Sequence, residues 1–302
     1  MIQSSSERGK FVISFDLELG WGSIENGLWK RLQDQGVFQQ LRHSLMRLLD
    51  AMDEAEVAGT WGVVGCLLAE AEQRDFSHLP PPLRSQVVAF LEEAAPETYA
   101  GGDLVEMIAD SNVAHTFCSH TYSHTRLGYP GVDESVVATE LARFKAVFPR
   151  TLNWSDSLIF PLNQEGYFDQ VMEAGFRLVR GKDQDPKKRS LVSKSLELIQ
   201  TPPLSQRNEV MPGLWRETDS MLFNTGRRRW KLPFVSRRAR AGLQLAVRKA
   251  GTFHVWTHPF DLASEPETLD ALIELIRYVA ELRDRGHLDV GSMSPMEPVE
   301  IE

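Results

Sequence analysis

The sequence predicts an α/β protein in which the strands run parallel. Short runs rich in β-branched and aromatic residues alternate with longer segments whose apolar residues recur at helical spacing. Such alternation is typical of a parallel sheet covered by helices. The 302 residues, 42% of them hydrophobic and 25% charged, are enough for a globular core. Length alone would allow two domains, but (β/α) barrels of this size are commonly single domains.

The individual elements follow from these patterns in chain order. The expected strands are 11–20, 59–65, 113–118, a short strand before Arg180, and 252–260. The expected helices are 37–55, 103–109, 133–146, 166–174 and 268–284. Asp133 is expected to cap its helix, because its side chain can accept a bond from a free backbone N–H of the first turn. No internal repeat is present.

Two histidines form the first candidate site. His120 and His124 are four residues apart at the end of a short apolar run, so both rings can turn toward one point. Neutral imidazole is the commonest metal ligand, and a two-histidine site usually adds a carboxylate. The pair therefore predicts a divalent-metal site, although solvated or core histidines at this spacing also occur by chance.

Two carboxylates end the first expected strand. Asp16 and Glu18 are two residues apart, so in a strand they point to the same face. Like charges raise each other's pKa, and a metal or an arginine would relieve that cost. Trp21 follows closely and is expected to line a pocket. The alternative interpretation is that the strand ends here with both acids in solvent.

His258 ends the last expected strand, immediately before Pro259. A histidine with its usual pKa near 6.5 is able to donate a proton at neutral pH, so His258 is a candidate general acid. His254 would share its face of the strand and is expected to be structural.

These three segments, in this order, resemble the polysaccharide deacetylase family (carbohydrate esterase family 4). The resemblance extends over roughly residues 11–262, and Ser119-His120-Thr121-Tyr122-Ser123-His124 carries most of it. It implies a distorted (β/α) barrel of about seven strands over residues 11–290, between a disordered N-terminus (1–10) and a flexible tail (291–302). It also implies removal of N- or O-acetyl groups from sugars with a bound divalent metal, zinc being the first choice.

The resemblance also implies roles for single residues. His120, His124 and Glu18 would bind the metal, Asp16 would be the base, and His258 would protonate the departing amine or alcohol. The family commonly has two adjacent aspartates, whereas here the second acid is a glutamate one position further on. The roles of Asp16 and Glu18 could be exchanged, and both assignments stay open at this point.

A third family motif, Arg-x-Pro-Tyr, is altered in this chain. The matching stretch, 158–164, keeps Pro161 but has no arginine before it. Asn163 and Gln164 are candidate substrate contacts, or they begin the helix that follows. Arg180 is the candidate to replace the missing cation. The departure leaves open that the chain is an inactive homologue.

Composition limits the partners and the compartment. The formal net charge of −9 argues against nucleic-acid binding as the main task. Two cysteines, Cys66 and Cys118, are too few for a disulfide framework, which favours a reducing compartment. The N-terminus has no apolar signal core, and no apolar run is long enough to span a membrane. We therefore expect a cytoplasmic enzyme of biosynthesis.

The segment 226–249 is strongly basic within this acidic chain. Its cations are Arg227, Arg228, Arg229, Lys231, Arg237, Arg238, Arg240, Arg248 and Lys249. The simplest interpretation is a solvated helix face. The functional alternative is a platform for the phosphates of a nucleotide-linked or lipid-diphosphate-linked sugar, since arginine suits phosphate contacts. The apolar neighbours of these cations allow at most a peripheral membrane contact.

Three functions remain open from the sequence. The first is a metal-dependent sugar deacetylase in polysaccharide or lipopolysaccharide (O-antigen) assembly. The second is a metal-dependent amide hydrolase with a non-sugar substrate. The third is a catalytically silent homologue that binds carbohydrate.

Overall fold

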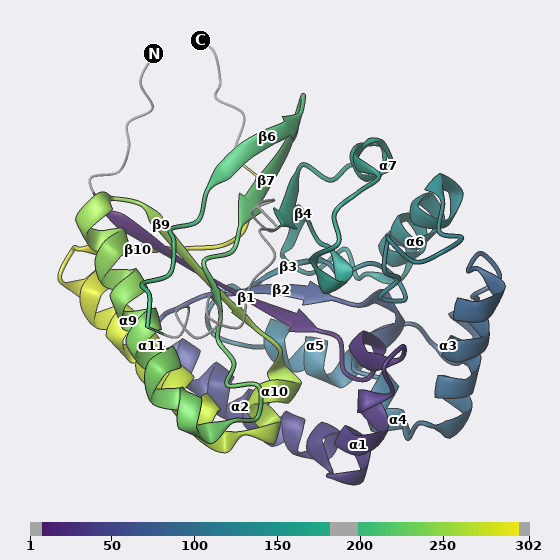
Figure 1. Cartoon of the computed structure of the whole chain (residues 1–302), viewed down its shortest axis with the longest axis horizontal. Coiled ribbons are helices and arrows are strands. Elements are labelled where there is room, and N and C mark those ends of the chain that lie inside the picture. Colours follow the sequence, from purple (N-terminus) through teal and green to yellow (C-terminus); the bar gives the residue numbers. More distant parts are fainter. Residues whose placement is uncertain (1–7, 182–198, 296–302) are drawn as a thin grey trace.

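The structure is a computed structural model that describes residues 8–181 and 199–295. It confirms the predicted α/β class, with helices packed around a mostly parallel sheet (Figure 1). The strands are β1 (Gly9–Leu17), β2 (Thr60–Val63), β3 (Thr116–Ser119), β4 (Trp154–Ile159), β5 (Leu178–Gly181), β6 (Arg207–Met211), β7 (Leu214–Thr218), β8 (Met221–Leu222), β9 (Thr252–Thr257) and β10 (Leu288–Gly291).

The helices fall into long ones that cover the sheet and short ones that connect it to the loops. The α-helices are α1 (Leu28–Asp34), α2 (Val37–Glu54), α3 (Pro81–Glu93), α4 (Pro96–Tyr99), α5 (Gly102–Ala109), α6 (Glu134–Val147), α7 (Phe168–Glu173), α9 (Leu232–Lys249), α10 (Pro259–Ser264) and α11 (Pro266–Asp284). Single 3-10 turns are η1 (Trp21–Ser23), η2 (Gly65–Leu67), η3 (Ala71–Gln73), η4 (Pro161–Asn163) and η5 (Arg229–Lys231).

β1 is the central strand of the sheet. Along one edge it pairs in parallel with β9, and along the other it pairs first with β10 and then with β2. Its residues from Phe11 to Leu17 are all buried. This is why its sequence is an almost continuous apolar run, as expected for a parallel strand covered on both faces.

The strand order β8-β9-β1-β2-β3-β4-β5-β7 is parallel throughout, and β6 is antiparallel to β7. β7 pairs with β5, and only two residues later the same segment pairs with β9 as β8. Residues 214–222 thus link the two ends of the parallel order. With β7 and β8 counted as one, the described residues form a distorted barrel of seven parallel strands, as predicted. β6, paired antiparallel with β7, projects beyond these seven strands (Figure 1).

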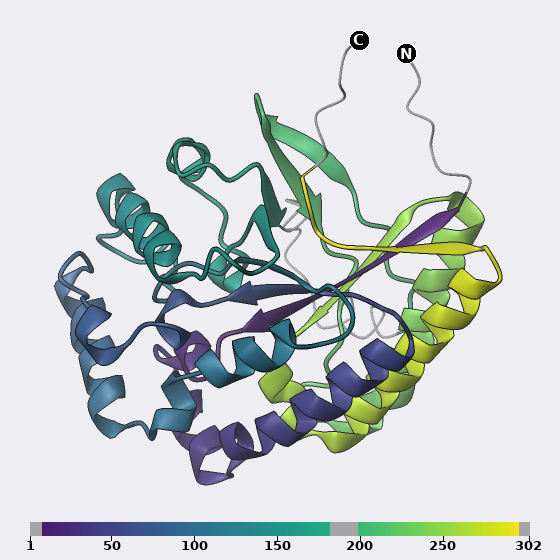
Figure 2. The same ribbon diagram turned by 180° about the vertical axis from the view of Figure 1, so that it is seen from behind.

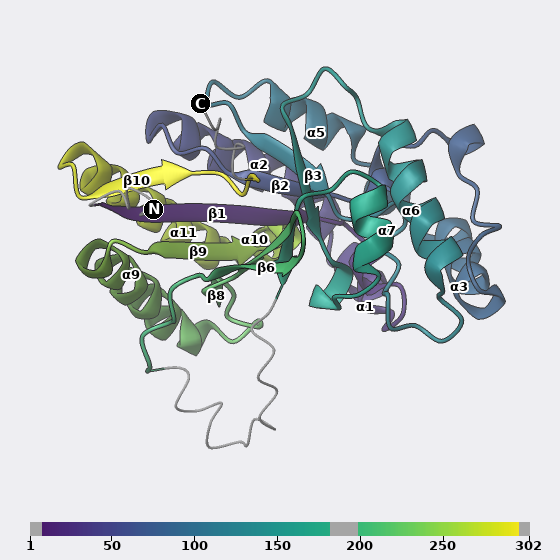
Figure 3. The ribbon, with the colours of Figure 1, turned by 90° about the horizontal axis from the view of Figure 1, so that it is seen from above.

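The long helices pack along the outside of the strands. Seen from behind, α2, α5 and α11 lie beside one another on the outer surface (Figure 2). From above, β10, β1 and β9 lie side by side, with α9 flanking β9 (Figure 3). α9 approaches the sheet closely at Gly242, where a Cβ atom would lie 2.2 Å from the Phe253 ring. No helix in the described ranges is long and apolar enough to cross a membrane.

The predicted limits of the barrel need correction at both ends. β1 already begins at Gly9, although residues 1–10 were expected to be disordered. Met293, expected in a flexible tail, is fully buried, and its N–H donates to Thr60 Oγ1 at 2.9 Å. Its carbonyl accepts bonds from Ser155 Oγ and Ser157 Oγ, each at 3.2 Å. The backbone polar groups of this segment therefore have partners inside the barrel. Residues 1–7 and 296–302 lie outside the described residues.

Candidate metal and catalytic site

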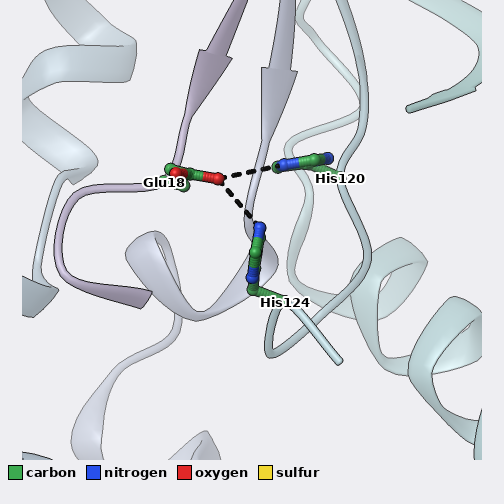
Figure 4. A group of neighbouring side chains, drawn as sticks. All are labelled: Glu18, His120 and His124. Atoms are coloured by element: carbon green, nitrogen blue, oxygen red, sulfur yellow. Dashed lines mark hydrogen bonds and ion pairs between the residues drawn. The ribbon is translucent and has the colours of Figure 1, made fainter. Parts of the chain in front are cut away.

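Three side chains that could bind a metal meet where β1 and β3 end. Glu18 follows β1 directly, His120 follows β3, and His124 lies in the next loop. Because β1, β2 and β3 are parallel, the residues after β1 and β3 lie at the same end of the sheet. Glu18 Oε2 is 3.2 Å from His120 Nε2 and 2.8 Å from His124 Nε2 (Figure 4). All three side chains are buried.

The partners of the two histidine rings show why this cluster suits a cation. His120 Nδ1 is 2.8 Å from the Ile159 carbonyl, which only accepts hydrogen bonds. Nδ1 must therefore carry a proton, and Nε2 is the nitrogen that faces Glu18, where a cation could take the place of a shared proton. His124 Nε2 is buried and makes no hydrogen bond within the described part of the chain. Two imidazoles and a carboxylate are a donor set typical of Zn²⁺ and related divalent metals, so these residues fit such an ion.

Glu18 is held in place by its surroundings. A Cβ atom on Gly22 would lie 2.0 Å from Glu18 Oε1, so only a glycine leaves room for this carboxylate. Burial by itself opposes the ionised form of Glu18. The charges of His124 and His258, together with the hydrogen bond from His120, outweigh burial and hold the pKa of Glu18 well below its usual value. Glu18 is therefore an ionised ligand candidate.

Asp16, the other acid near the end of β1, has a different partner. Arg180, from β5, donates from Nη1 to Asp16 Oδ1 at 2.7 Å and from Nη2 to Oδ2 at 2.6 Å. Both side chains are buried, and the guanidinium also lies over the Trp256 ring at 4.5 Å. Burial would raise the pKa of Asp16, but the Arg180 charge outweighs it and lowers that pKa. Arg180, the candidate to replace the missing arginine of the third motif, thus pairs with Asp16, the candidate base.

His258 faces the other oxygen of Glu18. Its Nε2 is 3.5 Å from Glu18 Oε1, and its Nδ1 is 3.0 Å from Asp261 Oδ2. Since a carboxylate only accepts, Nδ1 carries a proton, and Nε2 is the nitrogen turned toward the site. Burial alone would lower the pKa of His258, but Glu18 and Asp261 raise it to about 9. Asp261 was not expected from the sequence, although it stands one helical turn after His258.

The predicted substrate contacts differ in their positions. A cavity of about 310 Å³ beside His124 is lined by Trp21 and Leu162, among others. Trp21 is only 2% exposed, and its indole N–H donates to the Tyr99 carbonyl at 2.9 Å. Asn163 and Gln164 do not line this cavity, and Gln164 Oε1 accepts a bond from the Gly128 N–H at 3.1 Å. Gln164 thus holds a neighbouring loop, and Leu162 reaches the cavity instead.

A buried polar chain inside the barrel was not expected from the sequence. Ser14 accepts a bond from Arg180 Nη1 at 3.1 Å, and its Oγ lies 2.8 Å from His254 Nε2. His254 Nδ1 is 3.1 Å from Glu217 Oε1. Burial would raise the pKa of Glu217, but His254 and the Arg207 charge hold it at about 2. His254 is thus buried between two polar partners, away from the metal ligands. Ser14 lies two residues before Asp16 and so shares its face of β1. This spacing was the indication in the sequence that Ser14 belongs to the buried polar chain.

Comparisons with known proteins extend the sequence resemblance to the fold. No protein-family model and no curated protein sequence matches the chain. A protein from Mycobacterium smegmatis described as a polysaccharide deacetylase is 17% identical, with a TM-score of 0.61 over 98% of this chain and 90% of its own. An allantoinase is 12% identical, with a TM-score of 0.58 over 98% and 89%.

A third similar structure comes from Pseudomonas aeruginosa PAO1 and is also described as a polysaccharide deacetylase. It is 12% identical, with a TM-score of 0.55 over 94% of this chain and 88% of its own. At these identities the likeness shows the fold. That fold is the one implied by the sequence resemblance, and it extends over nearly the whole chain.

Proposed function

We propose that this chain, on a fold shared with polysaccharide deacetylases, is a metal-dependent hydrolase that removes an N- or O-acetyl group from a sugar. The observation that carries the proposal is the arrangement around Glu18. One oxygen of this buried carboxylate faces His120 and His124, and the other faces His258. Zinc is the proposed metal, and polysaccharide or lipopolysaccharide (O-antigen) biosynthesis in the cytoplasm is the proposed setting.

The roles of the side chains follow from their partners. A divalent metal held by Glu18, His120 and His124 supplies Lewis-acid activation of a water and of the acyl carbonyl. The closeness of Glu18 to both histidines supports Glu18 as the ligand and Asp16 as the base. Arg180 fixes the plane of the Asp16 carboxylate and keeps it ionised, ready to accept a proton from the attacking water.

His258 is the proposed general acid. Its Nε2 is turned toward the site, while Asp261 holds Nδ1 and so fixes the ring. A proton on Nε2 would pass to the departing amine or alcohol as the acyl bond breaks. Trp21 is proposed to contact the sugar at the cavity wall. Asn163 and Gln164 would meet only a substrate that extends beyond this cavity.

A second candidate is hydrolysis of an amide in a small non-sugar molecule. The cavity of about 310 Å³ lies at the low end of the range for small-molecule sites and suits a small substrate of either kind. One similar structure is described as an allantoinase, which shows that the fold is not confined to proteins described as acting on polysaccharides. Turnover of small amides without release of acetate from any acetylated sugar would favour this candidate.

The first experiment is the metal content of the purified protein beside His120→Ala and His124→Ala. We expect about one metal ion per chain in the wild type and loss of metal in both variants, because two protein ligands are too few for tight binding. Acetate release from acetylated nucleotide-sugars would then be measured with the metal-loaded wild type. Absence of metal, with no uptake from added zinc, would contradict the proposal. Retained metal without hydrolysis would favour a silent carbohydrate-binding protein.

A further inference from the structure

Glu140, in α6, is a fully buried carboxylate outside the proposed metal site. Its Oε2 accepts a bond from the Ser123 backbone N–H at 2.9 Å. Its Oε1 accepts one from Ser123 Oγ and lies near His78 Nε2, both at 2.7 Å. A buried polar group persists only when it is hydrogen-bonded, and these three contacts provide partners for both oxygens.

The direction of these hydrogen bonds is fixed by the carboxylate, which only accepts. The single proton of the Ser123 hydroxyl points at Glu140, so Thr125 Oγ1, 2.8 Å from Ser123 Oγ, donates to that hydroxyl. His78 must carry its proton on Nε2. The Ser123 N–H, the Ser123 hydroxyl and His78 Nε2 thus all donate to the Glu140 carboxylate. A side chain without two acceptor oxygens at this position would leave buried donors unpaired.

The segment held by Glu140 is the one that presents His124. Ser123 immediately precedes His124, whose φ is +59°, and Thr121 has a φ of +62°. Left-handed backbone is strained at residues other than glycine, so this loop keeps its shape only if its surroundings impose it. The two hydrogen bonds that Ser123 donates to Glu140 supply part of that constraint.

His78 connects the same carboxylate to the wall of the cavity. It lies just before α3, whose Leu83 and Val87 line the cavity next to His124. Side-chain exposure is 8% for His78 and 1% for Glu140, so the link between them is shielded from water. A single buried carboxyl group therefore joins the histidine loop to one side of the cavity.

We propose that Glu140 is a positioning residue that holds His124 in its ligating orientation and, through His78, ties that ligand to the cavity wall. The inference deepens the proposed function and rests on the metal site described there. Groups that hydrogen-bond to a metal ligand hold it in place, and their loss typically weakens metal affinity by about 10–100-fold; Glu140 would act on His124 in the same way through the adjacent Ser123.

The test is the affinity of the folded, metal-free protein for Zn²⁺, measured by competition with a chromophoric chelator. Glu140→Met keeps the approximate length of the side chain but removes both acceptors, and we expect affinity to fall by about 10–100-fold. Glu140→Gln keeps one acceptor and should lie between Met and the wild type. Ser123→Ala leaves the α6 core intact and should also weaken binding, so the test survives if Glu140→Met does not fold.

Asp53→Asn is the matched control. Asp53 holds the 111–113 loop through bonds from Ser111 Oγ and from the backbone N–H groups of Asn112 and Val113, at the opposite end of β3. Its substitution should lower the melting temperature and leave Zn²⁺ affinity unchanged. Equal Zn²⁺ affinity in the wild type, Glu140→Met and Ser123→Ala would overturn the inference while the metal site stands. Failure of the wild type to bind Zn²⁺ would instead overturn the proposed function itself.

Discussion

Asp16 and Glu18 stand on one strand yet have opposite kinds of partner. Asp16 forms an ion pair with the guanidinium of Arg180, whereas Glu18 faces three imidazoles. Both therefore stay ionised although both are buried, because each has its own source of positive charge. A carboxylate already paired with arginine has less to offer a metal, which is the physical reason to assign the two acids different roles.

The sequence predicted part of this site and missed the rest for definable reasons. The meeting of Glu18 with His120 follows from the parallel order β1-β2-β3, which brings the carboxyl ends of β1 and β3 to one edge of the sheet. Arg180 was a candidate, but its partner was not predictable, because β5 stands four strands from β1 in the sheet order and reaches Asp16 only through the barrel interior. Gly22 was missed since a glycine after a tryptophan has no distinctive pattern.

Gly22→Ala is expected to disable the metal site with little loss of stability. The new Cβ would lie 2.0 Å from Glu18 Oε1, and the end of a side chain is easier to displace than backbone. Glu18 should swing away from His120 and His124, so we expect loss of bound metal. Metal content and melting temperature would be measured together. Gly102→Ala, whose Cβ meets nothing within 4 Å, is the control and should keep its metal.

At the scale of elements, regular patterns were predicted well. The expected helix at 37–55 is α2 (Val37–Glu54), and that at 268–284 is α11 (Pro266–Asp284). The predicted cap is confirmed too, since Asp133 Oδ1 accepts a bond from the Val136 N–H at 3.0 Å. The strand β8 was missed because it is two residues long, and β10 because its sequence, Leu-Asp-Val-Gly, has no run of β-branched or aromatic residues. In strands this short, pairing with neighbours rather than local sequence decides the structure.

The basic segment is divided between two environments. Along α9, Val235, Ala239 and Leu243 are buried, so the predicted solvated face is the one with Arg237, Arg240 and Arg248. The preceding loop carries Arg227 and Arg228 and ends where η5 begins at Arg229. Just before these arginines, Asn224 donates a hydrogen bond to Asp261 of α10, the partner of His258. We propose that this loop contacts the phosphates of a nucleotide-linked or lipid-diphosphate-linked sugar.

Neutralising this loop should weaken binding of a carrier-linked substrate only. We expect Arg227→Gln, Arg228→Gln and Arg229→Gln together to raise KM for the carrier-linked sugar and to leave a small free sugar unaffected. The matched control removes three charges from exposed positions of α9, through Arg237→Gln, Arg248→Gln and Lys249→Gln, and should leave KM unchanged. Steady-state kinetics with both substrates would decide. Equal changes for the two substrates would contradict the proposal.

For the molecule as a whole, stability should fall as the pH drops below about 6.5, because of His115. This side chain is 3% exposed, and its Nδ1 accepts a bond from the Gly59 N–H at 3.0 Å. Burial lowers the pKa of His115 to about 4, against the opposing charge of Asp53. In the unfolded chain the pKa is near 6.5, so between these values only the unfolded state takes up the proton. Acid therefore favours unfolding in this range.

From pH 6.5 to pH 5 the resulting loss is about 2 kcal/mol in the free energy of unfolding. Urea unfolding at the two pH values would measure it in the wild type and in His115→Asn. The variant lacks this titrating group, so its free energy of unfolding should change less over the same range. An identical change in both proteins would show that another group is responsible.

The position of β1 between β2 and β9 also has a consequence for how the chain is made. Ser14 and His254, which meet across the β1–β9 pair, are 240 residues apart. At ribosomal rates of about 5–20 residues per second, the edge of β1 that pairs with β9 stays unpaired for roughly 10–50 s during synthesis. An apolar strand with an open edge is prone to pair with other chains. Nascent copies on one messenger are therefore most exposed to mutual aggregation before residues 252–257 emerge, and protection by a chaperone would matter most in that interval.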